Sequence, residues 1–395
     1  MTSEHPDILP QLNNDKQSSA LLRLLDQSLA RKIIRTKPTD MGLAEHAPYP
    51  FMAMVGQLEM RVALILSIIN PSIGGVLLIG PRGTGKTTAV RSLVDLLPNI
   101  EVSDCNEEVL PIHLMNEHAR ILYPDCFERY ERGESISHFE RMRLVELPLN
   151  ARLEDVVGGI NERIATQQNK IRLERGILAR ADQNLLYVDE VNLLANEITD
   201  AILDAAAMGS YTVRRGAMIG TYRSQFVLIG SMNPEEGRLR PQLMDRFGLR
   251  VNVRGVTNLA ERMEVYRRVQ SYKENPLAFV KTWDKVTADT RDDILRAREN
   301  LPNIGITDKV ENFGLMLVQA LGIDSHRAEY ALFEAARAYA ASDNREEVTI
   351  DDMRFVAPLA LRERKSDFMS RYFEQAHEED IHIKQQLDKI QAELS

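Results

Sequence analysis

A glycine-rich loop at residues 80–87 constrains this chain more than any other feature. Its sequence, Gly-Pro-Arg-Gly-Thr-Gly-Lys-Thr, matches the pattern G-x-x-x-x-G-K-[ST]. The apolar residues 76–79 before it predict a buried strand, and residues 89–97 after it predict an amphipathic helix that ends at Pro98. A strand, a loop and a helix in this order direct backbone N–H groups and a helix N-terminus toward one point, which suits a polyphosphate. The sequence therefore predicts a nucleotide-binding site.

The side chains of this loop have separable roles. We expect Lys86 to reach the β- and γ-phosphates of ATP, and the hydroxyl of Thr87 to ligate Mg²⁺. The residues expected to bind the nucleotide here are Gly80, Pro81, Arg82, Gly83, Thr84, Gly85, Lys86, Thr87 and Thr88.

Two later apolar runs end in polar residues. Residues 185–188 lead into Asp189 and Glu190, and residues 226–230 lead into Asn233. Strands that alternate with helices predict an α/β fold with a parallel sheet, whose ligands bind beyond the carboxyl ends of the strands. We expect Asp189 to hold Mg²⁺, Glu190 to activate the attacking water as general base, and Asn233 to hydrogen-bond that water or the γ-phosphate.

An arginine follows the strand predicted at residues 226–230. Arg246 lies in the segment 238–247 and is expected to point away from its own nucleotide, toward the site of a neighbouring subunit. Arginine fingers of this kind accelerate phosphoryl transfer by roughly 10³–10⁵. The alternative is an ion pair within the chain, to Asp245 or Glu235. A head-to-tail interface of this type closes into a ring.

Composition limits the remaining classes of function. A net charge of −9 over 395 residues argues against nucleic acid as a partner, and no apolar run approaches the ~18 residues of a membrane span. Cys105 and Cys126 provide no disulfide framework, so we expect a cytoplasmic protein. The two cysteines lie near His113, His118 and His138, but their spacing lacks the short paired loops of zinc modules, and we expect no structural metal there.

The order of motifs resembles that of the AAA+ ATPases. More narrowly, three segments are similar to the small ATPase subunit of magnesium chelatase: residues 188–194, 230–237 and 239–248. Residues 49–57 and 70–75 are similar to that family's lead-in to the phosphate loop, and the likeness extends over about residues 47–365.

The resemblance assigns further roles to single residues. It implies that Asn233 is the first sensor of the nucleotide and Arg246 the finger that completes a neighbour's site. Arg327 would be the second sensor, and Val55 and Gly56 would lie near the adenine. From the residues alone, Arg327 is equally well a surface salt-bridge partner, and its action on its own or a neighbour's nucleotide stays open.

The resemblance also implies a biological role. Members form a hexameric ring, work with a subunit that bears an integrin-like domain, and drive a porphyrin-binding subunit to insert Mg²⁺ into protoporphyrin IX for chlorophyll or bacteriochlorophyll synthesis. We therefore expect an ATPase with no porphyrin site of its own. The alternatives are a chelatase-like or MoxR-like AAA+ chaperone that remodels another integrin-domain partner, and an assembly module that hydrolyses ATP slowly.

The expected organisation is an AAA+ nucleotide-binding domain with a helical second domain. We predict a polar N-terminal arm (1–45), the AAA+ domain (46–255), linking helices (256–304), a helical lid (305–365) and a helical tail (366–395).

Three inserts depart from the family pattern. Residues 105–145 are unfamiliar, residues 161–175 are long and polar, and the hairpin predicted at 211–223 carries Arg214 and Arg215 instead of acidic residues. Partner contact and decoration without function both remain open for these inserts. The tail carries an apolar stripe formed by Ile383, Leu387, Ile390 and Leu394. We expect it to pack back on the body, and the alternative is a helix that docks on a partner.

Overall fold

The computed structural model describes most of the chain beyond the predicted arm. The described residues are 48–105, 110–115, 119–159, 174–215 and 218–365, and, in the tail, 375, 379, 381–387, 389 and 391. The chain divides into two units, residues 1–46 and 47–395. The predicted arm lies outside the described residues, as do residues 161–173 of the polar insert.

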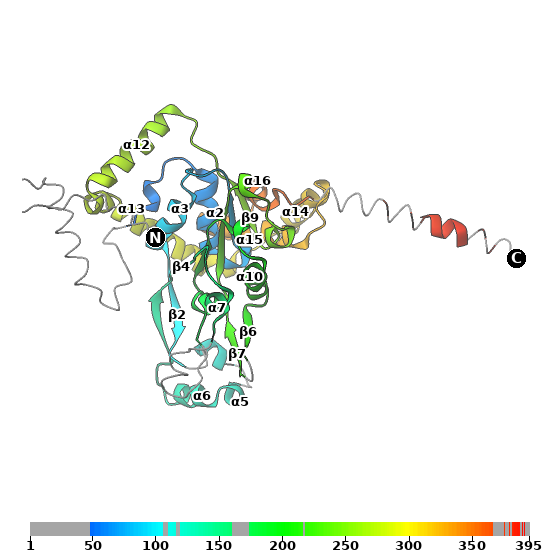
Figure 1. Cartoon of the computed structure of the whole chain (residues 1–395), viewed down its shortest axis with the longest axis horizontal. Helices are drawn as coiled ribbons and strands as arrows, with labels where there is room; N and C mark the ends of the chain where they lie inside the picture. The colour runs from blue at the N-terminus through cyan, green and yellow to red at the C-terminus, as the bar shows by residue number, and fades with distance from the viewer. Residues whose placement is uncertain are drawn as a thin grey trace, which may run out of the picture. The chain divides into compact units, whose positions relative to one another are not determined.

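A five-stranded parallel sheet forms the centre of the second unit (Figure 1). The order of its strands is β4 (Leu144–Leu147), β5 (Leu185–Val188), β8 (Val227–Met232), β1 (Val76–Ile79) and β9 (Leu249–Asn252). All residues of β1, β5 and β8 are buried, which explains why these strands are continuous apolar runs without alternation. The predicted parallel α/β core is confirmed.

The two faces of the sheet pack against different helices. Leu78 and Tyr187 belong to a core that also includes α2 (Leu58–Ile69) and the lid helix α15 (His326–Ser342). Leu77 and Leu186 belong to a second core. That second core includes α7 (Leu153–Val157), α9 (Ile177–Arg180) and α10 (Asn196–Met208). The alternation along each strand sets this division, because successive side chains point to opposite faces.

Two details of the predicted helices were wrong. The segment 57–69 is predicted from its sequence to be a helix with Leu58, Val62, Ile65 and Ile69 on one face. The side chain of Leu58 is instead 64% exposed, whereas Leu64 and Ile68, outside that stripe, are fully buried. Because α2 is apolar on nearly all sides, periodicity did not identify its buried face. The helix after the glycine-rich loop, α3 (Lys86–Ser92), begins and ends earlier than predicted and is followed by a 3₁₀ turn, Leu93–Leu96.

The unfamiliar insert is a small substructure. Its hairpin pairs β2 (Asn99–Ser103) with β3 (Ser137–Arg141). Three short helices follow β2: α4 (Pro111–Leu114), α5 (Ala119–Leu122) and α6 (Pro124–Glu131). They enclose a separate small core formed by Cys105, Leu114, Cys126 and Ile136.

Both cysteines of the insert are buried and unbonded to each other. His138 instead contacts Asp104 at 2.8 Å. Within the described ranges no cluster of three or more His, Cys, Asp or Glu side chains is arranged to hold a metal ion. His118 lies outside these ranges, and the side chain of His113 is not described.

The second hairpin follows its prediction. β6 (Ser210–Arg215) pairs with β7 (Met218–Arg223), and Thr212 hydrogen-bonds Thr221 across the strands at 3.1 Å. Figure 1 shows this hairpin and the β2–β3 insert extending from the sheet toward the bottom of the view.

Helices complete the chain. The segment predicted to link the two domains contains α12 (Leu259–Glu274) and α13 (Pro276–Asn300). The segment predicted as the lid contains α14 (Asp308–Ala320), α15 and α16 (Ile350–Leu361). None of the helices within the described ranges is both long and apolar enough to cross a lipid bilayer.

The C-terminal stripe does not pack as expected where it is described. Residues 381–387 are helical, and the side chains of Ile383 and Leu387 are 50% and 59% exposed. The expectation that they pack back on the body is wrong at these two positions. Ile390 and Leu394 lie outside the described residues.

Candidate nucleotide-binding site

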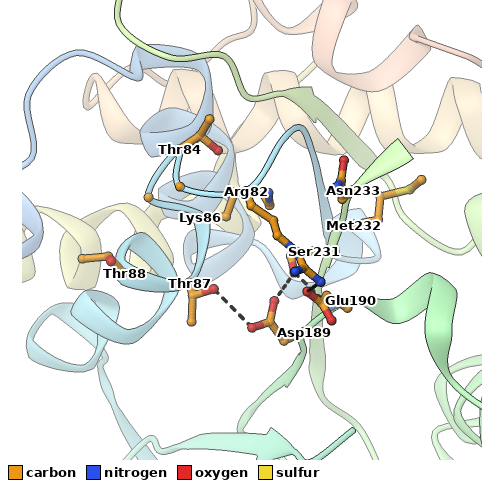
Figure 2. Close-up of a pocket in the computed structure, with 12 residues that line it drawn as sticks. Arg82, Thr84, Lys86, Thr87, Thr88, Asp189, Glu190, Ser231, Met232 and Asn233 are labelled. Carbon is orange, nitrogen blue, oxygen red and sulfur yellow. Dashed lines mark hydrogen bonds and ion pairs between the residues drawn. The ribbon is translucent and has the colours of Figure 1, made fainter. Parts of the chain in front are cut away.

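A cavity of about 210 Å³ opens beyond the carboxyl ends of β1, β5 and β8 (Figure 2). The parallel register places these strand ends level with each other, since Ile79 pairs with Met232 and Val188 with Gly230. The cavity is lined by Arg82, Gly83, Thr84, Gly85, Lys86, Thr87, Thr88, Asp189, Glu190, Ser231, Met232 and Asn233. The structure thus brings together residues from three separate segments of the sequence.

Close packing and turn geometry both require glycine in the loop. A Cβ atom on Gly80 would lie 2.1 Å from the carbonyl oxygen of Val253, so no side chain fits there. Gly85 adopts a φ of 85° just before α3, a conformation that costs little only for glycine. The loop can therefore curl tightly and still continue into a helix N-terminus that faces the cavity.

Lys86 is held by the loop itself. Its Nζ donates hydrogen bonds to the carbonyl oxygens of Gly80 at 2.7 Å and Pro81 at 2.9 Å. Burial lowers the pKa of Lys86, while the nearby carboxylates of Asp189, Glu190 and Glu236 oppose that shift. Gly80 and Pro81 thus position the lysine through their carbonyls and do not line the cavity themselves.

A hydroxyl and carboxylate network joins the loop to β5. The Thr87 hydroxyl lies 3.2 Å from Asp189 Oδ2, and the Tyr187 hydroxyl lies 2.9 Å from Asp189 Oδ1 and 3.2 Å from Thr87 Oγ1. Ser231 also donates to Asp189. Burial raises the pKa of Tyr187, which keeps its hydroxyl a neutral donor. Three hydroxyl groups therefore fix the carboxylate.

Sequence reasoning missed Tyr187 and Ser231. Tyr187 carried a faint signal, because it is the one residue with a polar side-chain atom in the run Leu-Leu-Tyr-Val. A hydroxyl at a strand position next to a carboxylate would have been worth testing as a partner for it.

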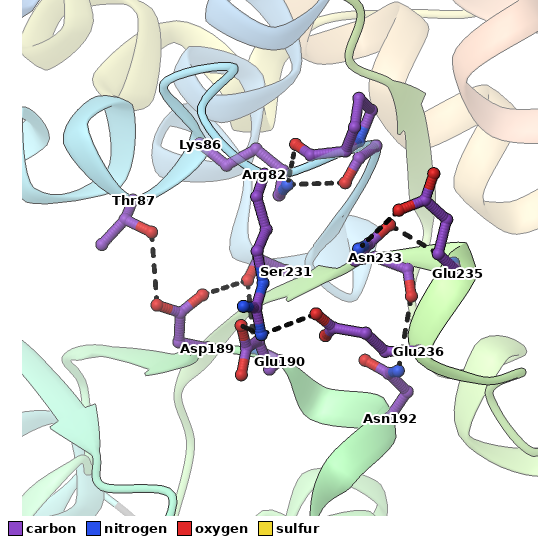
Figure 3. Close-up of polar contacts among 12 residues, drawn as sticks. Arg82, Lys86, Thr87, Asp189, Glu190, Asn192, Ser231, Asn233, Glu235 and Glu236 are labelled. Atoms are coloured by element: carbon purple, nitrogen blue, oxygen red, sulfur yellow. Dashed lines mark hydrogen bonds and ion pairs between the residues drawn. The ribbon is translucent and has the colours of Figure 1, made fainter.

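Glu190 makes two contacts that set its position (Figure 3). Its backbone adopts a φ of 49°, an uncommon conformation for a residue with a side chain, and its N–H donates to Ser231 Oγ at 3.1 Å. Its Oε1 accepts a hydrogen bond from Arg82 Nη2 at 3.2 Å, and the same Nη2 lies 2.6 Å from Glu236 Oε1. One guanidinium nitrogen therefore bridges two carboxylates.

Asn233 directly follows β8 and caps the turn after it. Its Oδ1 accepts from the backbone N–H of Glu235 at 3.3 Å, and its Nδ2 lies 3.4 Å from Glu235 Oε2. The residue is only 4% exposed, although it lines the cavity. The side chain is thus held at the cavity wall by a short turn, Pro234–Glu236.

The two predicted arginines lie away from this cavity. Arg327 pairs with Asp245 at 3.6 Å, and Asp245 also accepts from Arg364 at 3.1 Å. The Arg246 guanidinium makes no hydrogen bond or ion pair within the described part of the chain, and its pKa is lowered by burial and by the neighbouring charge of Arg327. The ion pair to Asp245 or Glu235 that we considered for Arg246 does not form there.

The lead-in residues pack beside the chain that follows β9. A Cβ on Gly56 would lie 3.4 Å from Val256, and Gln57 Nε2 donates to the carbonyl oxygen of Arg254 at 2.6 Å. Neither Val55 nor Gly56 lines the cavity itself. Their predicted place beside the adenine stays a prediction.

The donor set fits Mg²⁺ and a polyphosphate. Mg²⁺ prefers oxygen ligands and keeps several waters, so a hydroxyl and a carboxylate 3.2 Å apart, on Thr87 and Asp189, are suitable protein partners. The curled loop, the α3 N-terminus and Lys86 supply the donors that phosphate oxygens need.

The fold and site define a P-loop ATPase of the AAA+ class. A family model described as "AAA lid domain" matches residues 317–389. The structure of a putative ATPase from Cytophaga hutchinsonii superposes with a TM-score of 0.51 at 20% identity, covering 79% of this chain and 83% of that one. This likeness supports the fold alone.

Sequence relatives narrow the class to one family. A magnesium-chelatase subunit ChlI homolog of Methanocaldococcus jannaschii is 44% identical over 80% of this chain and 85% of its own length. The magnesium-chelatase 38 kDa subunit of Rhodobacter capsulatus is 39% identical over 84% of this chain and 92% of its own. The chain therefore belongs to the family of the magnesium-chelatase ATPase subunit, as the sequence motifs indicated.

Proposed function

We propose that this chain is the ATP-hydrolysing motor subunit of a magnesium chelatase. It uses ATP and Mg²⁺, and it couples hydrolysis to the insertion of Mg²⁺ into protoporphyrin IX by a partner subunit in chlorophyll or bacteriochlorophyll synthesis. One observation carries the ATPase part: Lys86, Thr87, Asp189, Glu190 and Asn233 all line one cavity. The family supports the chelatase part.

Five residues and the backbone of the loop have defined parts in the proposed hydrolysis. The loop N–H groups and Lys86 would bind the phosphates, and Thr87 and Asp189 would hold Mg²⁺, which would supply positive charge against the phosphates. Glu190 accepts a proton from the attacking water, and Asn233 orients that water against the γ-phosphate. The bond to ADP then breaks, and inorganic phosphate is released.

We place Arg246 and Arg327 at the site of a neighbouring subunit. Both belong to a patch around Asp245 that contributes no residue to the cavity of the same chain. An unpaired guanidinium at a half-buried position is suited to an incoming phosphate. The resulting head-to-tail contact closes into a ring, for which we propose six subunits.

The proposed partners are the other chelatase subunits. The relatives are named as subunits, which implies that they act within a larger enzyme. We propose an integrin-domain subunit and a porphyrin-binding subunit, with the metal insertion performed on the latter. The cytoplasmic location remains a prediction from sequence, to be checked by fractionating the source cells.

Mixing two inactive variants tests the shared site. Arg246→Ala should bind ATP without hydrolysing it, and Lys86→Ala should fail to bind it. Mixed rings contain some sites with an intact loop on one subunit and an intact Arg246 on the next, so mixing should restore part of the ATPase rate. No recovery at any ratio, with mixed rings verified by a tagged pull-down, would refute the shared site.

Reconstitution tests the chelatase assignment separately. This chain, combined with integrin-domain and porphyrin-binding subunits from the same source, should convert protoporphyrin IX to its Mg²⁺ form, read by fluorescence. Glu190→Gln in the same mixture is the matched control and should not. An active ATPase that never supports insertion would retain the motor and remove the chelatase role.

A further inference from the structure

The bridge formed by Arg82 is the part of the cavity that the proposed hydrolysis leaves unexplained. Arg82 Nη2 is shared between the base, Glu190, at 3.2 Å and Glu236 at 2.6 Å (Figure 3). The Arg82 side chain is 70% exposed, whereas the two carboxylates are 24% and 20% exposed. The arginine is thus the solvent-exposed partner of the bridge, and the two carboxylates are the more buried ones.

Glu236 has an unused acceptor. Its Oε2 is buried without a hydrogen-bond partner within the described part of the chain. A buried carboxylate oxygen without a donor is unfavourable, so the shared bridge leaves an interaction unmade. A guanidinium presents several N–H groups in one plane and binds a carboxylate through two of them. If Arg82 moved wholly onto Glu236, that oxygen would gain its donor.

The same movement would free the base. Glu190 Oε1 accepts from Arg82 in the shared bridge, and an oxygen that is occupied by a guanidinium is less available to accept a proton from water. Glu236 also sits in the turn that Asn233 caps, with its backbone N–H bonded to the Asn233 carbonyl oxygen at 3.1 Å. A shift of Asn233 toward the γ-phosphate would therefore carry Glu236 with it.

We propose that Glu236 is a positioning residue that draws Arg82 away from Glu190 and so controls when the base is free. The inference rests on the proposed ATPase function and adds a regulatory pair to its site. Arg82 acts through Glu190 in this arrangement, and its restraint ends when both guanidinium contacts pass to Glu236.

A suppression experiment on the full-length ring tests this pair. Glu236→Gln removes the charge that attracts Arg82 but keeps the shape, so Arg82 should stay on Glu190 and kcat should fall about 10-fold, with the KM for ATP unchanged. Adding Arg82→Met to that variant should restore kcat by about 5-fold, because the restraint is gone. A purely structural role for Glu236 would not be rescued by a second substitution.

The controls separate this proposal from the ATPase assignment. Arg91 and Glu146 form a similar pair outside the cavity, at 2.8 and 2.9 Å, and Glu146→Gln with or without Arg91→Met should leave kcat unchanged. Glu190→Gln reports on the base independently. If Glu190→Gln is inactive but the double variant is no faster than Glu236→Gln, the pair does not control the base; if Glu190→Gln is fully active, the ATPase assignment itself fails. Thermal unfolding of each variant should match that of the wild type.

Discussion

The nucleotide cavity and the patch around Asp245 have opposite charge balances. In the cavity, Lys86 and Arg82 face three carboxylates, those of Asp189, Glu190 and Glu236. Around Asp245 the balance is reversed, because four guanidinium groups, those of Arg246, Arg250, Arg327 and Arg364, face three carboxylates, those of Asp204, Asp245 and Glu363. The cavity has the base and the metal ligands, whereas the patch has guanidinium groups in excess of carboxylates.

The two regions therefore complement each other. Hydrolysis of ATP builds negative charge on the transferring phosphoryl group, and the cavity of one chain offers few cations to meet it. The patch offers cations that lie away from the phosphate-binding cavity of the same chain. Two copies placed head to tail would join one cavity to one patch, which is the geometry of a ring.

Removing the finger should produce the largest effect. Arg246→Ala is expected to lower kcat by roughly 10³-fold with little change in ATP affinity, because the arginine meets charge that develops only in the transition state. Steady-state phosphate release and binding of a fluorescent ATP analogue measure the two quantities. Loss of binding together with kcat would place Arg246 at its own nucleotide.

Removing the base should come next. Glu190→Gln is expected to lower kcat by about 100-fold while the variant binds ATP and stays assembled, because the amide keeps the shape of the carboxylate and cannot accept a proton. Single-turnover hydrolysis and analytical ultracentrifugation in ATP provide the readouts. Wild-type turnover would exclude Glu190 as the base.

The two arginines that contact Asp245 should differ in how much they contribute to the free energy of unfolding. Arg364 is 1% exposed and donates to the carbonyl oxygens of Phe247 and Gly248 as well as to Asp245; its burial lowers its pKa to about 10. Arg364→Met should lower the free energy of unfolding by about 2 kcal/mol, since Asp245 and the carbonyl oxygens of Phe247, Gly248 and Ala360 lose their donor. Urea unfolding measures it.

Arg327→Met is the matched control for that variant. The Arg327 side chain is 48% exposed, so its loss should change the free energy of unfolding by less than about 0.5 kcal/mol. Arg327→Met should instead lower the rate of ATP hydrolysis, because we place this arginine at the site of a neighbouring subunit. Equal destabilisation by the two variants would contradict the distinction between a structural arginine and one available to a neighbour.

Local motifs predicted the cavity far better than the patch. The glycine-rich loop and the strand-end carboxylates are contiguous stretches whose chemistry depends on backbone geometry, so their roles could be read without long-range contacts. Asp245 gathers Arg327 and Arg364 from 82 and 119 residues away, and only the packing of the lid brings them together. Arg82 and Glu236 likewise meet across the fold.

The insert at residues 105–145 shows a second limit. The insert's hairpin, with its own small core, gave no periodic pattern, because four buried side chains spread over 32 residues do not repeat. The apolar stripe on α2 failed for the opposite reason, an excess of apolar positions. Pattern reasoning works where one face is buried and the other exposed.

Loss of an ion pair inside the lid should destabilise the fold less than Arg364→Met does and should not affect hydrolysis. Asp352 accepts two hydrogen bonds from Arg345 at 2.6 Å and one from the Thr349 N–H at 2.7 Å. Burial alone would raise its pKa, but these bonds outweigh burial and lower the pKa of Asp352 below its usual value. A carboxyl group whose pKa is lowered by folding stabilises the folded state at any pH above its unfolded pKa of ~4, and this contribution is lost as the pH falls through the folded pKa.

Asp352→Asn should therefore cost about 1 kcal/mol of unfolding free energy at pH 7. That difference from wild type should shrink below pH ~4, while kcat at pH 7 stays unchanged. A fall in kcat without a change in urea stability would mean that charge inside the lid, and not only at its Asp245 edge, takes part in the chemistry.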